Sequence, residues 1–298
     1  MRETQWKVSQ LWKYPIKSCR GTQVQEARIG VHGLEDDRRF MIVDAKTGMF
    51  AAQRSDDGLG VAIKSMCLIR PEIKGEAGNQ WIDVTAPGMG KITIYPGLFI
   101  PVGARRREVQ IWQTKCQAVI ADPDTNGWFN DFLNKERPGE YELVKFPNGA
   151  ERRAKMGFQQ LRFADAYPFL VVSEQSLRDL NERIGGTPLP MNRFRPNIVI
   201  SGGEPYDEDR LDRLVISGVE LEGKTLCVRC VTTATNQETA ERGKEPLATL
   251  AKYRRSKYVP DGGVVFGRNF NHLSTGMIRV GDEVAAISYN ENDPLVVQ

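Results

Sequence analysis

Short segments in which apolar and polar residues alternate, separated by turn residues, constrain the fold of this chain most. In "QWKVSQLWKYPI", Trp6, Val8 and Trp12 alternate with polar neighbours, which indicates a half-buried strand. The stretch "RRFMIVDAKTGMFAA" predicts two strands around a turn from Asp44 to Gly48, and "QWIDVTAPGMGKITIYP" repeats this pattern. We read "VQIWQTKCQAVIADP" as one further strand. The chain is therefore expected to be rich in β-structure.

Helices are expected to be few and short. The segment "NGWFNDFLNK" predicts a helix with one apolar face, formed by Trp128, Phe129, Phe132 and Leu133. A buried strand ends at Ser173, a preferred N-cap residue, and the helix that follows would end at Gly185. "EPLATLAKYRR" predicts another short helix, and "GGVVFGRNF" and "GMIRVGDEVAAI" are expected to be strands. The fold class is therefore α+β and β-rich.

Composition excludes several classes of protein. The chain has 298 residues, enough for one large domain or two ordinary ones, and is 40% hydrophobic. Its formal net charge of +3 argues against a dedicated nucleic-acid binder. No apolar run has the length of a signal peptide core or a membrane span. The five cysteines are an odd number at irregular spacings, so we expect a reducing cytoplasm rather than a disulfide framework.

A Cys-x-x-Cys pair, Cys227 and Cys230, stands in "GKTLCVRCVTT". A structural zinc site usually needs two such pairs, and this chain has one pair and only His32 and His272 as histidines. A thioredoxin-type pair opens a helix, whereas these flanks favour a strand. Two cysteines packed in a β-core are the remaining alternative.

Strand geometry separates the two thiols. Side chains three apart on a continuous strand point to opposite faces, so Cys227 and Cys230 would not easily bind one metal together. A single thiolate suits a metal that brings its other sulfurs with it, as molybdenum does in molybdopterin. That cofactor carries a phosphate, which requires cations. The sequence places basic residues at strand ends or between the cysteines: Lys17, Arg38, Arg193, Arg195 and Arg229.

Taken in order, "YPIKSCRG", "GLEDDRRFM", "FADAYPFLVVSEQSL", "RFRPNIVISG", "CVRC" and "KEPLATL" resemble the MOSC-domain proteins, and more narrowly their amidoxime-reducing component group with its bacterial members. The match runs over nearly the whole chain. It implies an N-terminal MOSC β-barrel-like domain over residues 1–125, packed on a MOSC-domain β-barrel with short helices over residues 126–298.

The resemblance also implies roles for particular residues. The second cysteine of the family pair, here Cys230, is the molybdenum ligand. The residues that hold the molybdenum cofactor correspond here to Lys17, Ser18, Arg38, Arg195, Asn197 and Arg229, with Cys230 itself. The acidic residue near the metal corresponds to Asp165, a candidate catalytic proton relay or water-orienting group. The alternative for Asp165 is a turn residue that bonds its own backbone.

This resemblance implies a molybdenum-dependent reductase that removes oxygen from nitrogen in N-hydroxylated compounds such as amidoximes and hydroxylamines. Two alternatives stay open: a sulfur carrier with a persulfide on Cys230, and a non-catalytic carrier of the cofactor. We expect no nucleic-acid partner, no membrane anchor, and a separate ferredoxin- or cytochrome-type electron donor with its reductase. Ala166 stands where relatives carry a hydroxyl residue, so substrate preference is expected to differ.

Overall fold

The largest sheet of the molecule closes on itself. The computed structural model describes residues 6–54, 60–76, 79–99, 105–256 and 263–290. Within them seven strands form a barrel, because the first and the last of these seven, β15 (Ile198–Ser201) and β1 (Trp6–Lys13), also pair with each other. The strands follow in the order β15, β14 (Phe169–Ser173), β18 (Val265–His272), β17 (Val219–Val228), β16 (Leu211–Ile216), β20 (Glu283–Tyr289) and β1. The short strand β2 (Thr22–Val24) pairs with β1.

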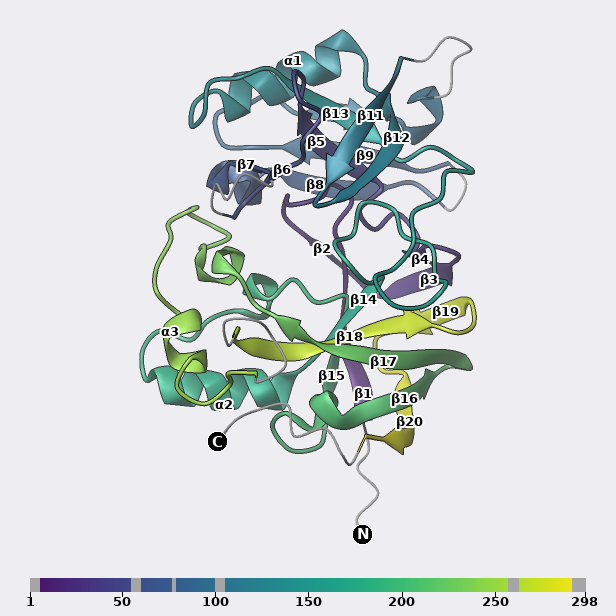
Figure 1. Ribbon diagram of the computed structural model, residues 1–298, viewed down its shortest axis with the longest axis vertical. Helices are drawn as coiled ribbons and strands as arrows, with labels where there is room; N and C mark the ends of the chain where they lie inside the picture. The colour runs from purple at the N-terminus through teal and green to yellow at the C-terminus, as the bar shows by residue number, and fades with distance from the viewer. Residues whose placement is uncertain (1–5, 55–59, 77–78, 100–104, 257–262, 291–298) are drawn as a thin grey trace.

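Strand β1 brings the start of the described chain into this barrel. It pairs with β15 on one side and β20 on the other, and in Figure 1 it lies in purple among green and yellow strands. Trp6 and Val8 are buried in the barrel core, as the alternation predicted. The register then shifts between Val8 and Gln10, so Leu11 continues this core and Trp12 packs against a different one. The extension of the pattern to Trp12 was wrong because a bulge changes the phase of alternation.

A second β-unit, formed by the described parts of residues 40–145 and called the upper unit below, lies above the barrel in Figure 1. Its four-stranded sheet has the order β11 (Arg106–Ile111), β12 (Thr114–Ile120), β13 (Tyr141–Lys145) and β5 (Phe40–Asp44). The segment at Met49 and Phe50 lies between the two edge strands of this sheet. Phe50 forms a single bridge to Val43 on β5, and Met49 forms one to Gln110 on β11. Smaller sheets are formed by β8 (Arg70–Lys74), β9 (Trp81–Thr85) and β10 (Ile92–Ile94), by β3 (Glu26–Gly30), β4 (Gly33–Leu34) and β19 (Gly276–Arg279), and by β6 (Ala51–Ala52) and β7 (Val61–Ala62).

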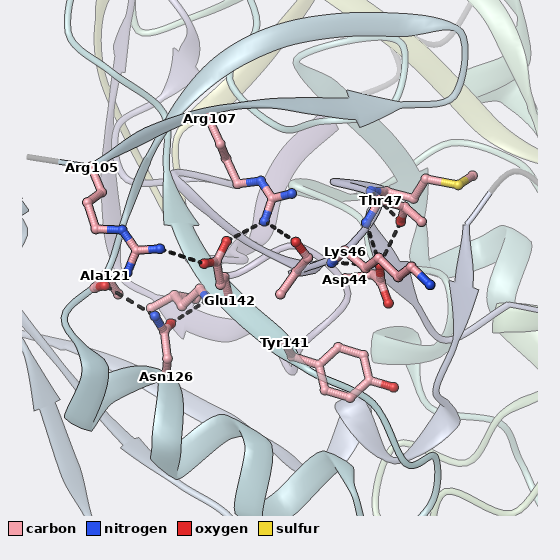
Figure 2. A network of polar contacts seen from close by, with 12 residues as sticks. Asp44, Lys46, Thr47, Arg105, Arg107, Ala121, Asn126, Tyr141 and Glu142 are labelled. Atoms are coloured by element: carbon pink, nitrogen blue, oxygen red, sulfur yellow. Dashed lines mark hydrogen bonds and ion pairs between the residues drawn. The ribbon is translucent and has the colours of Figure 1, made fainter.

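The segment expected to be one strand over residues 109–123 is instead part of a hairpin. Strands β11 and β12 pair antiparallel around a two-residue turn at Trp112 and Gln113. Figure 2 shows how this hairpin is fixed to the sheet: Arg107 on β11 donates to the carboxylate of Glu142 on β13, and also to the carbonyl of Ala45 at 2.8 Å. These contacts fix the base of the β11–β12 hairpin, and so they also fix the position of its tip.

Local signals predicted the turn after Asp44 and both ends of helix α2 (Glu174–Ile184). Asp44 accepts hydrogen bonds from the backbone of Lys46 and Thr47, which forms the expected turn (Figure 2). Ser173 caps helix α2, which ends at Gly185 in the left-handed conformation, with φ of 68°. The other helices are α1 (Pro123–Leu133), α3 (Leu247–Leu250) and the 3-10 turns η1 (Lys64–Leu68), η2 (Pro96–Phe99), η3 (Met191–Arg193), η4 (Asp207–Arg210) and η5 (Val231–Ala234).

The predicted fold class is confirmed: the molecule is β-rich, with short helices and a closed barrel. The division at residue 125 stays a prediction. In the structure β13, which follows that position, pairs with β5, and β1, which precedes it, belongs to the barrel. Among the described residues, no helix has the length and apolar character needed to span a bilayer.

Candidate functional site

A cavity of about 620 Å³ lies where the two β-units meet. Its wall includes Phe50 and Trp112 from the upper unit, Phe169 and Leu170 from β14, and Thr225 from β17. All eight site residues predicted from the sequence line this one cavity: Lys17, Ser18, Arg38, Asp165, Arg195, Asn197, Arg229 and Cys230. The fold therefore brings together residues that lie far apart in the chain.

The charge of the wall is strongly one-sided. Among the described residues, seven basic side chains and one carboxylate line the cavity: Lys17, Arg38, Arg54, Lys155, Arg195, Lys224 and Arg229, and Asp165. A concave surface with this excess of cations attracts anions and holds them. The geometry therefore favours an anionic ligand.

The backbone is strained around the cavity. Across the part of the chain that the structure describes, eight residues other than glycine have φ in the left-handed region, and four of them line the cavity: Ser18 at 66°, Arg38 at 43°, Trp112 at 54° and Arg195 at 56°. This conformation is unfavourable for residues with a side chain, and it is concentrated at functional sites. Three of these four residues belong to the predicted set.

Tyr14 holds two of the arginines in place. The guanidinium carbons of Arg38 and Arg195 lie 4.2 and 4.3 Å from the centre of its buried ring, and its hydroxyl donates to the carbonyl of Pro196 at 3.0 Å. Arg195 also donates to the carbonyl of Cys19 at 2.7 Å. The Tyr14 ring is thus a fixed support for two cations. Sequence reasoning missed it, although it stands in the same "YPIKS" motif as Lys17.

Asn197 uses its amide inside the protein. Its Oδ1 accepts from Arg38 at 3.2 Å and from the backbone of Leu170 at 3.3 Å, and its Nδ2 donates to the carbonyl of Trp12 at 3.3 Å. It is buried, although it contributes to the cavity wall. Its contacts are those of a residue that orients Arg38.

Asp165 and Lys17 form an ion pair in the cavity wall. Lys17 Nζ donates to Asp165 Oδ1, and Trp112 Nε1 donates to the same oxygen at 2.9 Å. The Lys17 side chain is 6% exposed, whereas 63% of the Asp165 side chain is open to the cavity. Among the described residues, the carboxylate bonds these two side chains and not its own backbone, so the turn alternative does not describe its contacts.

The pair sets the protonation of both groups. Desolvation by the surrounding cavity wall acts to raise the pKa of Asp165, but the Lys17 ammonium and the hydrogen bonds from Lys17 and Trp112 outweigh it and hold this pKa well below its usual range. Burial lowers the pKa of Lys17, and Asp165 opposes that shift. Asp165 is therefore ionised at neutral pH, which suits an acceptor of hydrogen bonds better than a proton donor.

Both cysteines of the pair line the cavity. The premise of one continuous strand was wrong, because β17 ends at Val228. The two thiols nevertheless differ in their surroundings, as the sequence suggested. Cys230 is exposed and directly precedes η5, whereas Cys227 packs partly against a core cluster. Burial raises the pKa of the Cys227 thiol, although the guanidinium of Arg229 opposes this shift and donates to its sulfur at 2.8 Å. Cys230 is thus the thiol that is open to a ligand.

Two family models match this chain. The model described as the MOSC N-terminal beta barrel domain matches residues 5–136, and the model of the MOSC domain matches residues 159–285. The first covers most of the upper β-unit together with β1, and the second covers most of the barrel strands.

Curated relatives match over nearly the same length. Mitochondrial amidoxime-reducing component 1 of Homo sapiens is 32% identical over 293 residues, which cover 93% of this chain and 82% of that protein. Mitochondrial amidoxime reducing component 2 of Bos taurus is 29% identical over 296 residues, with the same coverage of 93% and 82%. The molybdenum cofactor sulfurase of Oryza sativa subsp. japonica is 28% identical over 275 residues, which are 87% of this chain but 32% of that protein.

Proposed function

The chain belongs to the MOSC-domain proteins of the amidoxime-reducing component family, and from this membership we propose that it is a molybdenum-cofactor-dependent reductase of N-hydroxylated compounds. The reaction removes the oxygen of an amidoxime or hydroxylamine as water. It consumes two electrons and two protons for each oxygen removed.

The observation that carries this proposal is an exposed thiol in a cationic cavity. Cys230 offers a soft ligand of the kind that molybdenum accepts. Basic side chains that line the same cavity, Arg38, Arg195 and Arg229 among them, match the phosphate of a pterin cofactor. Arg229 Nε is buried and has no hydrogen-bond partner among the described residues, so one donor next to the cysteine remains unused. The residues present fit this cofactor.

Particular residues would hold the cofactor. Cys230 would bind the metal, and Arg38, Arg195 and Arg229 would bind the pterin and its phosphate, with Ser18 beside them. Asn197 would act by orienting Arg38. When bound, the cofactor supplies the two-electron chemistry at which the nitrogen–oxygen bond is broken.

Asp165 and Lys17 would serve the substrate side of the site. The ionised carboxylate of Asp165 can accept a hydrogen bond from the hydroxyl or amino group of an amidoxime. Lys17 Nζ carries a proton in contact with that carboxylate, and its lowered pKa makes it a better acid than an ordinary lysine. In this arrangement Asp165 orients the substrate or a water molecule, and Lys17 is the nearer source of a proton.

Two other functions use the same residues. A sulfur carrier with a persulfide on Cys230 is favoured by the similarity to the cofactor sulfurase of Oryza sativa. A non-catalytic carrier would bind the cofactor in the same cationic cavity and turn nothing over. Molybdenum content separates the reductase from the sulfur carrier, and turnover separates it from the cofactor carrier.

The test compares the two cysteines. Protein purified from a host that makes the cofactor should contain close to one molybdenum per chain and should reduce benzamidoxime with reduced methyl viologen. Cys230→Ser should abolish this activity, whereas Cys227→Ser should retain most of it, since Cys227 is partly buried against the core. Full activity of Cys230→Ser would rule out the proposed mechanism.

We also propose that the electrons come from a separate redox protein. The sequence holds no Gly-rich dinucleotide fingerprint between a strand and a helix. A small ferredoxin- or cytochrome-type carrier would deliver electrons through a weak, transient contact. The cytoplasmic location expected from the cysteines stays a prediction.

A further inference from the structure

Trp112 occupies an unusual position in this fold. It stands at the tip of the β11–β12 hairpin of the upper unit and lines the cavity that the barrel also walls. Its φ of 54° lies in the left-handed region, which is a genuine outlier for so bulky a residue. Asparagine, aspartate or glycine would form the same turn with less strain. The contacts of the side chain must therefore compensate for an unfavourable backbone.

Those contacts fix the indole ring in one orientation. The Phe50 ring meets it in an edge-to-face contact with the ring centres 4.9 Å apart, and the guanidinium carbon of Arg54 lies 4.2 Å from its centre. Gln110 donates to the Trp112 carbonyl at 2.8 Å and steadies the turn itself. Because the ring is held in this way, its N–H points at a fixed place, which is Asp165 Oδ1 at 2.9 Å.

The carboxylate is left with one open oxygen. Both Lys17 and Trp112 donate to Oδ1, and among the described residues no donor reaches Oδ2. Arg152 is buried behind this segment and donates to the carbonyl of Asp165 at 2.9 Å, so the backbone of Asp165 is fixed as well. Two donors on one oxygen define the rotation of the carboxylate and leave the other oxygen for a ligand in the cavity.

We propose that Trp112 is a positioning residue, whose indole N–H holds the Asp165 carboxylate so that Oδ2 faces the substrate. The upper unit thereby completes a site whose metal ligand belongs to the barrel unit. The expected effect of Trp112 on turnover rests on the proposed function, whereas its hydrogen bond to Asp165 does not. The substrate group that it implies is a hydroxyl or N–H donor, as an N-hydroxylated amidine carries.

The first test needs neither the cofactor nor activity. In cofactor-free protein labelled with ¹⁵N, the indole resonance of Trp112 is identified by its loss in Trp112→Phe, a change that keeps an aromatic ring and removes the N–H. Asp165→Asn should shift this resonance and speed the exchange of its proton with solvent. Trp128, whose indole donates to the carbonyl of Gly90, is the internal control and should not respond. An unchanged Trp112 resonance in Asp165→Asn overturns the proposal. If Trp112→Phe folds poorly, the loss of the same resonance in Trp112→Tyr identifies it instead.

The second test uses the loaded enzyme. Trp112→Phe should raise KM for benzamidoxime about tenfold, the loss expected for one hydrogen bond to a charged group, with a smaller change in kcat. Trp128→Phe should leave both parameters unchanged. Equal kinetics for Trp112→Phe and wild type overturn the proposal. If the wild-type enzyme reduces no N-hydroxylated compound, the proposed function fails, and the resonance experiment alone decides the role of Trp112.

Discussion

Replacing Arg195 with methionine separates the contribution of this residue to folding from its contribution to cofactor binding. Its guanidinium lies 4.3 Å from the centre of the Tyr14 ring and donates to the carbonyl of Cys19 at 2.7 Å. Arg195 is therefore a structural residue as well as a candidate ligand of the cofactor. The methionine side chain keeps much of the volume and removes both polar functions.

The two contributions have different expected sizes. Leaving the Cys19 carbonyl without a donor costs about 1–3 kcal/mol, and losing the stacked cation costs about 0.5–2 kcal/mol. The free energy of unfolding of the cofactor-free protein should therefore fall by about 1.5–5 kcal/mol. A hydrogen bond from a guanidinium to an anionic ligand contributes about 1.5–3 kcal/mol, so cofactor affinity should fall by about 10- to 150-fold in addition.

The assay measures both quantities on the same variants. Urea unfolding of cofactor-free protein gives the stability, and the molybdenum-to-protein ratio at rising cofactor concentration gives the affinity. Arg193→Met is the matched control: Arg193 stands two residues earlier and does not line the cavity. Arg195→Lys should recover part of the affinity because it keeps the charge. Unchanged affinity in Arg195→Met, or an equal loss in Arg193→Met, would refute the assignment of Arg195 to the cofactor.

Three further outcomes are expected. First, the pKa of Asp165 is held below its usual range, so the stability gained from its ionised form is present above about pH 4 and is lost as pH falls through the lowered pKa. In urea unfolding, the stability difference between wild type and Asp165→Asn should be constant from about pH 5 to pH 8 and should shrink in stronger acid. A difference that grows below about pH 4 would contradict the ion pair. Second, Gly267→Ala should unfold at clearly lower urea than Gly218→Ala: both glycines have positive φ, but a Cβ at Gly267 would lie 2.7 Å from the carbonyl of Val171, whereas nothing lies within 4 Å of one at Gly218. Equal urea midpoints for the two variants would show that strand β18 shifts to accommodate the added Cβ and would contradict this expectation. Third, the purified protein should reduce amidoximes with reduced viologen and be inert with NADH or NADPH alone; robust coupled NADPH oxidation would reveal a dinucleotide site.

Features with local causes could be predicted from the sequence. The cap at Ser173 and the stop at Gly185 depend on residues next to them, and both are where the sequence puts them. The sequence also indicated which residues to look for at a shared site, because their motifs resemble a family and because cations at strand ends suggest an anionic ligand. The structure places these residues around one cavity, and their roles stay predictions. The sequence alone could not show that Lys17 would bond Asp165 rather than face a ligand directly, since 148 positions separate them.

Features that break a local rule could not be predicted. The turn at Trp112 contains none of the residues that favour left-handed φ, so the sequence suggested one continuous strand. The bulge after Val8 moves Trp12 out of the phase that its spacing implies. Cys227 and Cys230 share a cavity because β17 ends at Val228, and no strong breaker in the sequence marks that end. In each case the tertiary contacts outweigh the local preference.

The path of β1 has a consequence for how this protein is made. Lys7 on β1 pairs with Ser201 and also with Glu283, so this strand is synthesised early but completed by partners that leave the ribosome much later. During that interval its apolar face has no barrel to cover it, and contacts of such long sequence separation form slowly. The upper unit, which is translated between β1 and the other barrel strands, can fold first. At that stage β1 has not yet paired with its barrel partners β15 and β20. Chaperone dependence and nascent-chain aggregation should therefore depend on this first strand more than on any strand of the upper unit.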